Sequence, residues 1–327
     1  IARTECAATW NTSLGCQALQ ALAAGGNYNT AMGGKAGTAI TTGDYNVALG
    51  YNALNTEDTG NKNVAVGADA LKNLNYAGDA FNTAVGHNSG YAMSTGTSNT
   101  LIGALSGDAL TDGNSNTAVG IRALSTETRG DRNVAIGYEA LYLQNNTSDV
   151  DAYNTAVGYV AGAAMTTGIN NTLIGGFAGD AMTTGHSSVA IGYEALGSAT
   201  IANHNVAIGL DAMNVNVAAD RNVAIGSEAL EFMTSPTTLD TYNVAIGYNA
   251  GKQVTTGTQN TLVGSLAGDA LTTGDDNIAI GKSALTTEDT GNKNIAIGTN
   301  ALEDLNYAGD SYNIGIGHSA GRDITTG

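Results

Sequence analysis

The side chains able to do chemistry in this chain are few and widely spaced. Aspartate recurs in the phrase Gly-Asp-Ala at Asp108, Asp180 and Asp269, and a pair of carboxylates is what glycoside hydrolysis requires. These copies lie four or five sequence repeats apart, roughly 20 Å at the spacing of stacked strands, whereas glycosidase carboxylates lie within about 10 Å of each other. We therefore expect solvated turn residues, with a cation held between copies of the chain as the alternative.

Other reactive side chains give no catalytic pattern. His87, His186, His204 and His318 do not neighbour a serine or cysteine nucleophile, so we expect no enzymatic activity. No metal-ligand spacing or cofactor motif is present, and we expect neither a metal nor a cofactor. Thr-Thr-Gly turns raise the alternative of ice binding, but they align only in neighbouring repeats and form no long array.

The two cysteines, Cys6 and Cys16, both lie near the start of the sequence. A disulfide between them would close a short loop in an oxidising compartment, and two free thiols are the alternative. The chain starts at Ile1 without an initiator methionine, which indicates a processed or truncated start.

One five-residue phrase, Asn-(Thr/Val/Ile)-x-(aliphatic)-Gly, organises the whole sequence. Most copies follow each other at seventeen residues, and the four longest spacings follow Gly67, Gly137, Gly226 and Gly298. Such a short, strict period predicts one coil of a solenoid per repeat. The eighteen closing glycines are Gly15, Gly33, Gly50, Gly67, Gly86, Gly103, Gly120, Gly137, Gly158, Gly175, Gly192, Gly209, Gly226, Gly247, Gly264, Gly281, Gly298 and Gly317.

Counted from this glycine as position zero, the residue types predict a strand. Positions −3 and −1 are β-branched or aliphatic, −2 is usually alanine and −4 is asparagine, which is the period-two pattern of a strand. Alanine or serine at +3 and Leu, Met or Gly at +4 predict a second short strand or extended segment. We expect an all-β, single-stranded parallel β-solenoid (β-roll) with coils of about 17 residues. Residues 1–10 would form an N-terminal cap or connection, and 11–327 one continuous solenoid of eighteen repeats.

Asparagine occupies position −4 in every repeat except one, where Ser188 replaces it. We expect these side chains to form a structural ladder in which each amide bonds the next coil or the turn backbone. Its members include Asn46, Asn63, Asn133, Asn205, Asn222, Asn243 and Asn294.

Both faces of the predicted strand are apolar, with alanine on one and larger residues on the other. A 17-residue coil is too thin to bury both, which favours association of parallel chains, and we expect a homotrimer. The net charge of −17 with only twelve Lys and Arg disfavours nucleic acid as a partner. No run of about 18 apolar residues predicts a membrane span.

The extra residues of the long repeats are expected to project from one side of the solenoid as contact loops. Their candidate contact residues are Tyr76, Asn145, Asn146, Pro236 and Tyr307. Tyrosines beside the repeat phrase either cover their neighbours or stack on sugars.

Residues 133–137, 222–226 and 243–247, each Asn-Val-Ala-Ile-Gly, resemble the head repeats of trimeric autotransporter adhesins and the related repeats of bacteriophage tail fibres. The resemblance covers nearly the whole chain, although adhesin head repeats are usually shorter than 17 residues. It implies a trimeric parallel β-roll that is extracellular, on a cell surface or on a virion. The sequence shows no coiled-coil stalk or membrane anchor and stops at a repeat boundary, so we expect a longer fibre or end-to-end assembly.

From these observations we expect a non-enzymatic structural fibre or shaft of an extracellular or virion appendage. The alternative is an adhesin whose insertion loops bind a glycan or a protein receptor on a host.

Overall fold

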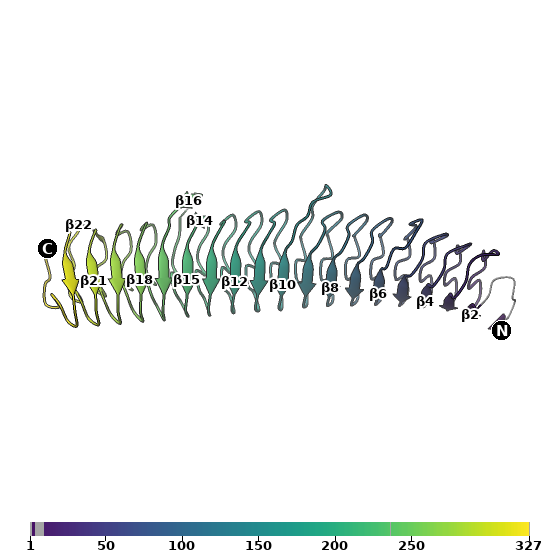
Figure 1. Ribbon diagram of the computed structural model, residues 1–327, viewed down its shortest axis with the longest axis horizontal. Coiled ribbons are helices and arrows are strands. Elements are labelled where there is room, and N and C mark those ends of the chain that lie inside the picture. The colour runs from purple at the N-terminus through teal and green to yellow at the C-terminus, as the bar shows by residue number, and fades with distance from the viewer. Residues whose placement is uncertain (1, 4–9, 236, 327) are drawn as a thin grey trace. The chain divides into compact units, whose positions relative to one another are not determined.

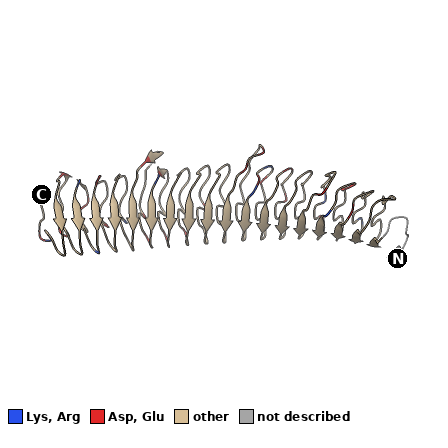
Figure 2. Cartoon of the chain, in the orientation of Figure 1, with Lys and Arg blue, Asp and Glu red and all other residues tan. Residues whose placement is uncertain are grey.

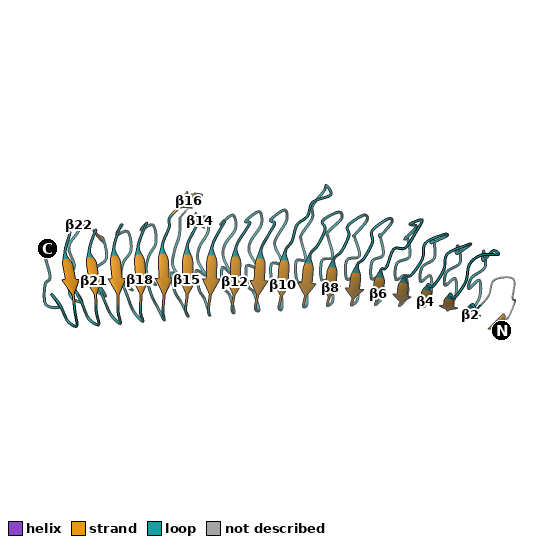
Figure 3. Ribbon diagram, viewed as in Figure 1, coloured by secondary structure: helices purple, strands orange, loops and turns teal. Residues whose placement is uncertain are grey.

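The computed structural model describes residues 2–3, 10–235 and 237–326 (Figure 1). The chain divides into two compact units, residues 1–167 and 168–327. Across the described residues every regular element is a β-strand and none is a helix (Figure 3). Each unit is a stack of coils of about 17 residues with one three-residue strand per coil, which confirms the predicted parallel β-solenoid.

In the first unit the strands β2 to β10 pair in parallel, each with its neighbours in sequence, and the short β1 pairs antiparallel with β2. The strands are β1 (Ala2–Arg3), β2 (Thr12–Leu14), β3 (Thr30–Met32), β4 (Val47–Leu49), β5 (Val64–Val66), β6 (Thr83–Val85), β7 (Thr100–Ile102), β8 (Thr117–Val119), β9 (Val134–Ile136) and β10 (Thr155–Val157).

The second unit repeats this arrangement and adds two small parallel pairs, β14 with β16 and β20 with β22, at the edges of insertions. Its strands are β11 (Thr172–Ile174), β12 (Val189–Ile191), β13 (Val206–Ile208), β14 (Ala219–Asp220), β15 (Val223–Ile225), β16 (Leu239–Asp240), β17 (Val244–Ile246), β18 (Thr261–Val263), β19 (Ile278–Ile280), β20 (Gly291–Asn292), β21 (Ile295–Ile297), β22 (Gly309–Asp310) and β23 (Ile314–Ile316).

The register keeps equivalent repeat positions side by side. In β4 and β5, for example, Val47 is opposite Val64 and Ala48 is opposite Ala65. The alanine at −2 points into the coil and is fully buried, as at Ala65 and Ala118, while positions −3 and −1 point outward. Only small or slender side chains fit inside so short a coil, which explains the alanine in most repeats.

The second extended segment predicted at +3 and +4 is wrong, because the chain turns there instead. Residues +2 and +4 have left-handed backbone conformations, with φ of 58° at Asp69 and 46° at Leu71. The Ala70 N–H bonds the Gly67 carbonyl of its own turn, whereas the Asp69 N–H reaches the Tyr51 carbonyl one coil back and the Leu71 N–H reaches the Ser89 carbonyl one coil ahead. A tight turn therefore satisfies the backbone by bonding alternately to both neighbouring coils.

Two positions of each coil, −2 and +4, contribute side chains to the core, and in many coils one of the two is large and the other small. Where −2 is leucine, as at Leu101, position +4 is glycine, and a methyl group on Gly107 would lie 2.9 Å from the Leu101 side chain. Where −2 is alanine, as at Ala118, a buried residue such as Leu124 fills the space from +4 in most coils. Where both positions are small, as at Ala84 and Gly90, side chains of the neighbouring coils fill the space, since a Cβ on Gly90 would lie 2.8 Å from Leu71 and 2.9 Å from Leu101.

Candidate functional site

The outward face of the strands has uniform chemistry in both units. Every residue at −3 and −1 is threonine or apolar, and these positions carry no charge in any repeat. In Figure 2 the three-residue strands are tan, the colour of uncharged residues. The segments coloured for charge lie in the loops. The large apolar side chains at these positions that expose 36% or more of their surface are Leu14, Met32, Ile102, Ile136, Ile174, Ile225, Ile246, Ile280, Ile314 and Ile316. We call this surface the strand face.

Aromatic side chains border the strand face at positions −5 and +1. Tyr28 and Tyr45 stack with ring centroids 4.7 Å apart, and Tyr138 and Tyr159 stack at 5.4 Å. Each of these four rings exposes 40% or more of its surface, so stacking covers one ring face and leaves an edge in solvent.

The asparagines at −4 are buried except Asn11 and Asn313 in the first and last coils, and they form continuous hydrogen-bond columns within each unit. The Asn46 side-chain oxygen accepts the Asn63 backbone N–H at 3.0 Å, and the Asn46 side-chain nitrogen donates to the Gly60 carbonyl at 2.8 Å. The same bond, from a backbone N–H to the side-chain oxygen of the preceding asparagine, is made by Asn133, Asn222, Asn243 and Asn294. The Asn205 N–H instead donates to the Ser188 hydroxyl at 3.2 Å. Ser188 thus keeps the column continuous.

A second column at position −6 was missed by sequence reasoning. The Asp44 carboxylate accepts the Asn27 N–H at 2.6 Å, and the Asn61 side chain accepts the Asp44 N–H at 2.7 Å. Asp131 and Asp220 accept equivalent N–H groups, each at 2.6 Å. The signal was present in the sequence as Asp or Asn two residues before the ladder asparagine, but it is mixed with Thr and His and is therefore weak.

The predicted contact residues lie in the loops of the four long coils. Tyr307 exposes 40% of its surface, Tyr76 and Asn145 are half-buried, and Asn146 is buried. Asn146 therefore faces the coil beneath, where its side-chain nitrogen donates to Glu127 Oε2 at 3.1 Å. Pro236 lies outside the described residues.

Each insertion is closed at its base by a basic residue, an aspartate and an aromatic ring, which we call the base cluster. In the first, Lys62 Nζ lies 2.6 Å from Asp79 Oδ2 and 4.9 Å from the centre of the Phe81 ring. This contact lowers the pKa of the Asp79 carboxyl. The other base clusters are Arg132–Asp151–Tyr153, Arg221–Asp240–Tyr242 and Lys293–Asp310–Tyr312. Lys or Arg occurs at −5 only in these four repeats, so the base cluster marks the insertions in the sequence.

Beneath the first insertion lies Glu57, a carboxylate with no exposed surface. Burial is the main cause that raises its pKa above that of an ordinary glutamate, and backbone N–H groups of Gly60 and Tyr76 act in the opposite direction.

This pKa shift predicts a pH dependence of stability. Because the folded protein binds the Glu57 proton more tightly than the unfolded chain, the free energy of unfolding falls as pH rises between the two pKa values. The stability of the protein relative to its Glu57→Gln variant should therefore decline over a pH range that starts near the ordinary glutamate pKa, roughly pH 4, and extends upward. Urea unfolding of both proteins across this range measures the difference, and a difference that grows with pH would contradict the assignment.

The candidate aspartates and histidines of the sequence make separate contacts. The Asp108 carboxylate binds the Ser125 hydroxyl, and Asp180 and Asp269 lie five coils apart in the second unit, where burial raises the pKa of each. His186 and His204 contact each other edge to face at 5.0 Å. Within the part of the chain that the structure describes, no three His, Cys, Asp or Glu residues are placed to hold a metal ion.

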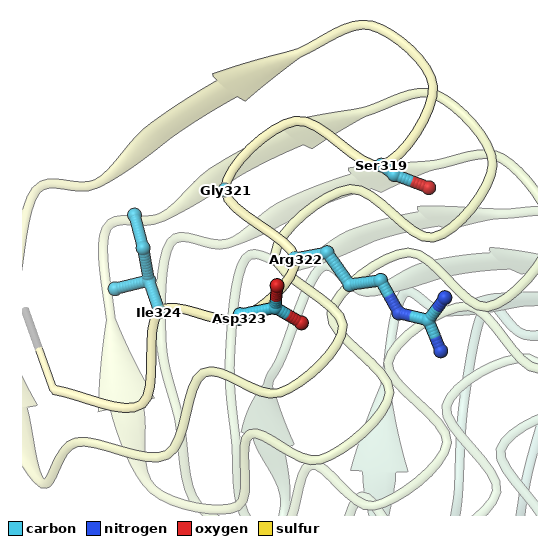
Figure 4. A pocket seen from close by; sticks show the side chains of 5 residues that line it. All are labelled: Ser319, Gly321, Arg322, Asp323 and Ile324. Carbon is cyan, nitrogen blue, oxygen red and sulfur yellow. The ribbon is translucent and has the colours of Figure 1, made fainter.

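Described residues of the second unit line two hollows. The hollow on the last coil is open to solvent, and Figure 4 shows the Arg322 side chain extending away from Ile324. Arg322 Nε instead lies 2.7 Å from Glu303 Oε2. The other hollow is small and polar, with Asp180, Glu194 and Asn214 in its lining. Each lining also includes a serine, Ser319 and Ser198, and the Ser198 hydroxyl donates to Asn214 Oδ1 at 3.5 Å.

Cys16 is exposed, and the disulfide predicted between Cys6 and Cys16 involves Cys6, which lies outside the described residues. Over the described residues, no helix has the length and apolar character needed to cross a membrane.

The repeated coil, the two polar columns and the parallel register define this chain as a β-solenoid repeat protein. No protein-family model matches it, and a search of curated proteins finds no similar sequence.

Proposed function

We propose that this protein is a non-enzymatic structural fibre or shaft in which further copies of the chain cover the strand face. The exposed apolar residues of that face carry the proposal. Ile102 and Ile136 in the first unit expose 39% and 38% of their surfaces, although the inner residues of the same strands, Leu101 and Ala135, are fully buried. A continuous apolar surface of this kind marks an interface more often than a free surface.

Charge supports a second copy as the occupant of the strand face. The chain has a net charge of −17, which opposes self-association over most of its surface. The uncharged strand face lets copies meet without placing carboxylates opposite each other. A homotrimer is the arrangement implied by the resemblance to adhesin and tail-fibre repeats, and it leaves the insertions outside.

The same resemblance supports an extracellular, cell-surface or virion location and end-to-end assembly into a longer appendage. A protein of this kind holds another structure at a distance, and its regular coils need to supply only stiffness and length.

Introducing a charge into the strand face tests the interface. The Ile136→Glu variant should have the mass of one chain, because a carboxylate buried between copies loses its hydration without gaining a partner. A single chain should tolerate the change, since Ile136 is already partly exposed. Sedimentation equilibrium gives the mass, and circular dichroism checks that the fold is kept.

The matched control is Leu143→Glu, which introduces the same charge at a residue of 43% exposure in an insertion loop. This variant should keep the mass of the unmodified protein. If Ile136→Glu also keeps that mass, the strand face is not the interface.

The alternative function is an adhesin, and the exposed aromatic rings of the base clusters favour it. Phe81, Tyr153, Tyr242 and Tyr312 each expose 50% or more of their surface beside a carboxylate and a cation, and such groups suit sugars or a protein receptor. Screening glycans and host proteins with the unmodified protein and with variants whose loops at Tyr76 and Tyr307 are shortened separates the two functions. Binding lost on shortening supports the adhesin, and absence of binding in both supports the shaft.

A further inference from the structure

We propose that three of the four insertion loops are latched to the coil beneath them by a buried Thr-Glu pair, which holds each loop as a fixed contact surface. The pairs are Thr56–Glu57, Thr126–Glu127 and Thr287–Glu288. This inference goes beyond the proposed fibre, because it says how the insertion loops are held in one conformation. It does not depend on how many copies of the chain associate.

The glutamate occupies a position that is apolar in most coils, where Gln144 and Asn216 are the other polar residues. At +7 other coils carry fully buried aliphatic or sulfur side chains such as Met93, Leu110 and Leu271. Glutamate replaces them only in the coil that precedes an insertion, and Glu57, Glu127 and Glu288 are themselves fully buried. A buried carboxylate is costly unless hydrogen-bond donors surround it, so its placement requires a compensating partner.

Those donors come from two successive coils. Glu57 Oε1 accepts the Gly60 N–H of its own coil at 2.7 Å, and Glu57 Oε2 accepts the Tyr76 N–H of the loop above at 3.3 Å. Glu288 makes the same contacts with Gly291 at 2.6 Å and Tyr307 at 3.2 Å.

The third pair has the same arrangement with a longer loop. Glu127 Oε1 accepts the Gly130 N–H at 2.8 Å and the Asn146 N–H at 3.0 Å. The Asn146 side chain adds a contact to Glu127 Oε2. The latch therefore recurs beneath insertions of different length and sequence.

The threonine of each pair adds a hydroxyl that donates to backbone carbonyls of the coil that carries the loop. The Thr56 hydroxyl lies 2.9 Å from the Lys72 carbonyl and 3.1 Å from the Leu74 carbonyl, both in the coil that carries the loop. Thr126 makes equivalent contacts with Tyr142 and Gln144. Each pair thus supplies an acceptor and a donor to one loop.

Glycine three residues after the glutamate makes room for the latch. A Cβ on Gly60 would lie 2.5 Å from the Glu57 carboxyl carbon and 2.5 Å from the Tyr76 carbonyl oxygen. A Cβ on Gly291 would meet Glu288 and Tyr307 at 2.5 and 2.6 Å. The sequence signature of the latch is therefore Thr-Glu-x-x-Gly, and it occurs three times, each time one coil before an insertion.

The fourth insertion supplies an internal contrast. Asn216 takes the +7 position beneath it, and its side chain bonds the Ala219 N–H at 2.8 Å and the Ala219 carbonyl at 3.0 Å. Both contacts lie in its own turn. The loop above is joined to its neighbour instead by β14 and β16 and by the Thr241 hydroxyl, 2.7 Å from Asn222 Oδ1.

The test replaces Glu57 by leucine, the side chain that ordinary coils use at this position. Hydrogen exchange measured by mass spectrometry over residues 73–80 should become at least about tenfold faster, because the Tyr76 amide loses its acceptor and the loop opens locally. Exchange in the strands of the first unit should stay as it is. Glu288→Leu should reproduce the effect over residues 304–311.

Thr56→Val and Asn216→Leu complete the design. Thr56→Val removes only the donor and should also speed exchange over residues 73–80. Asn216→Leu should leave residues 237–241 unchanged, because Asn216 bonds its own turn. Unchanged exchange over 73–80 in Glu57→Leu would overturn the latch, and so would an increase spread evenly through every coil of the unit.

Discussion

Replacement of Asn99 by alanine is expected to destabilise the first unit by about 3 to 5 kcal/mol, because it leaves several buried polar groups without partners. The Asn99 side-chain oxygen accepts the Asn116 N–H at 2.9 Å and the Asn116 side-chain nitrogen at 3.2 Å. The Asn99 side-chain nitrogen donates to the Gly113 carbonyl at 2.9 Å. Alanine offers none of these contacts, and water has no access to a fully buried position.

The natural exception in the column provides the control. Ser188 accepts the Asn205 N–H through its hydroxyl, so Asn99→Ser should retain the corresponding contact and lose less stability than Asn99→Ala. Hydrogen exchange of residues 99–133, together with thermal unfolding, measures both variants. Equal stability of the alanine and serine variants would show that the column does not act through the backbone N–H contact.

The second large effect is expected at the glycine that closes each strand. Gly120 has φ of 140°, and a Cβ built there would lie 2.2 Å from the Gly137 carbonyl oxygen of the next coil. Because the obstacle is backbone, Gly120→Ala can be accommodated only by separating two coils, and we expect a loss of about 4 kcal/mol or more, the range of the most damaging single substitutions.

Gly317 separates the two causes of this loss. Its φ is 120°, but no atom lies within 4 Å of a Cβ built there. Gly317→Ala should therefore show only the backbone strain, about 1 to 3 kcal/mol. Thermal unfolding of the two variants gives the comparison, and an equal loss in both would mean that the close approach of coils at Gly120 contributes nothing.

The repeat pattern predicted the coil correctly and the turn incorrectly. Thr117, Ala118 and Val119 alternate as a strand should, and strict seventeen-residue spacing leaves one register for parallel pairing. Ala123 and Leu124 look equally suited to a strand, yet they lie in a turn. The left-handed backbone of non-glycine residues such as Leu124 is stabilised by hydrogen bonds to neighbouring coils. The local sequence propensity of a residue contains no information on such bonds.

The insertion loops were located from the spacing alone, but their anchors were not. The Tyr76 N–H donates to Glu57, which lies nineteen residues earlier in the sequence. That contact becomes visible only when the long coil is aligned in space with the coil beneath it. A comparison of +7 residues across repeats would have revealed the exchange of Leu110 or Leu271 for Glu57, because a carboxylate in an apolar column is the strongest irregularity in the pattern.

The most direct test of the proposed fibre is the mass of the unmodified protein by sedimentation equilibrium at several concentrations. A trimer whose copies cover one another's strand face predicts three times the 32.8 kDa of one chain, independent of dilution until dissociation begins. A mass of 32.8 kDa at every concentration would contradict the account, because the strand face would then remain exposed to water in the working form of the protein.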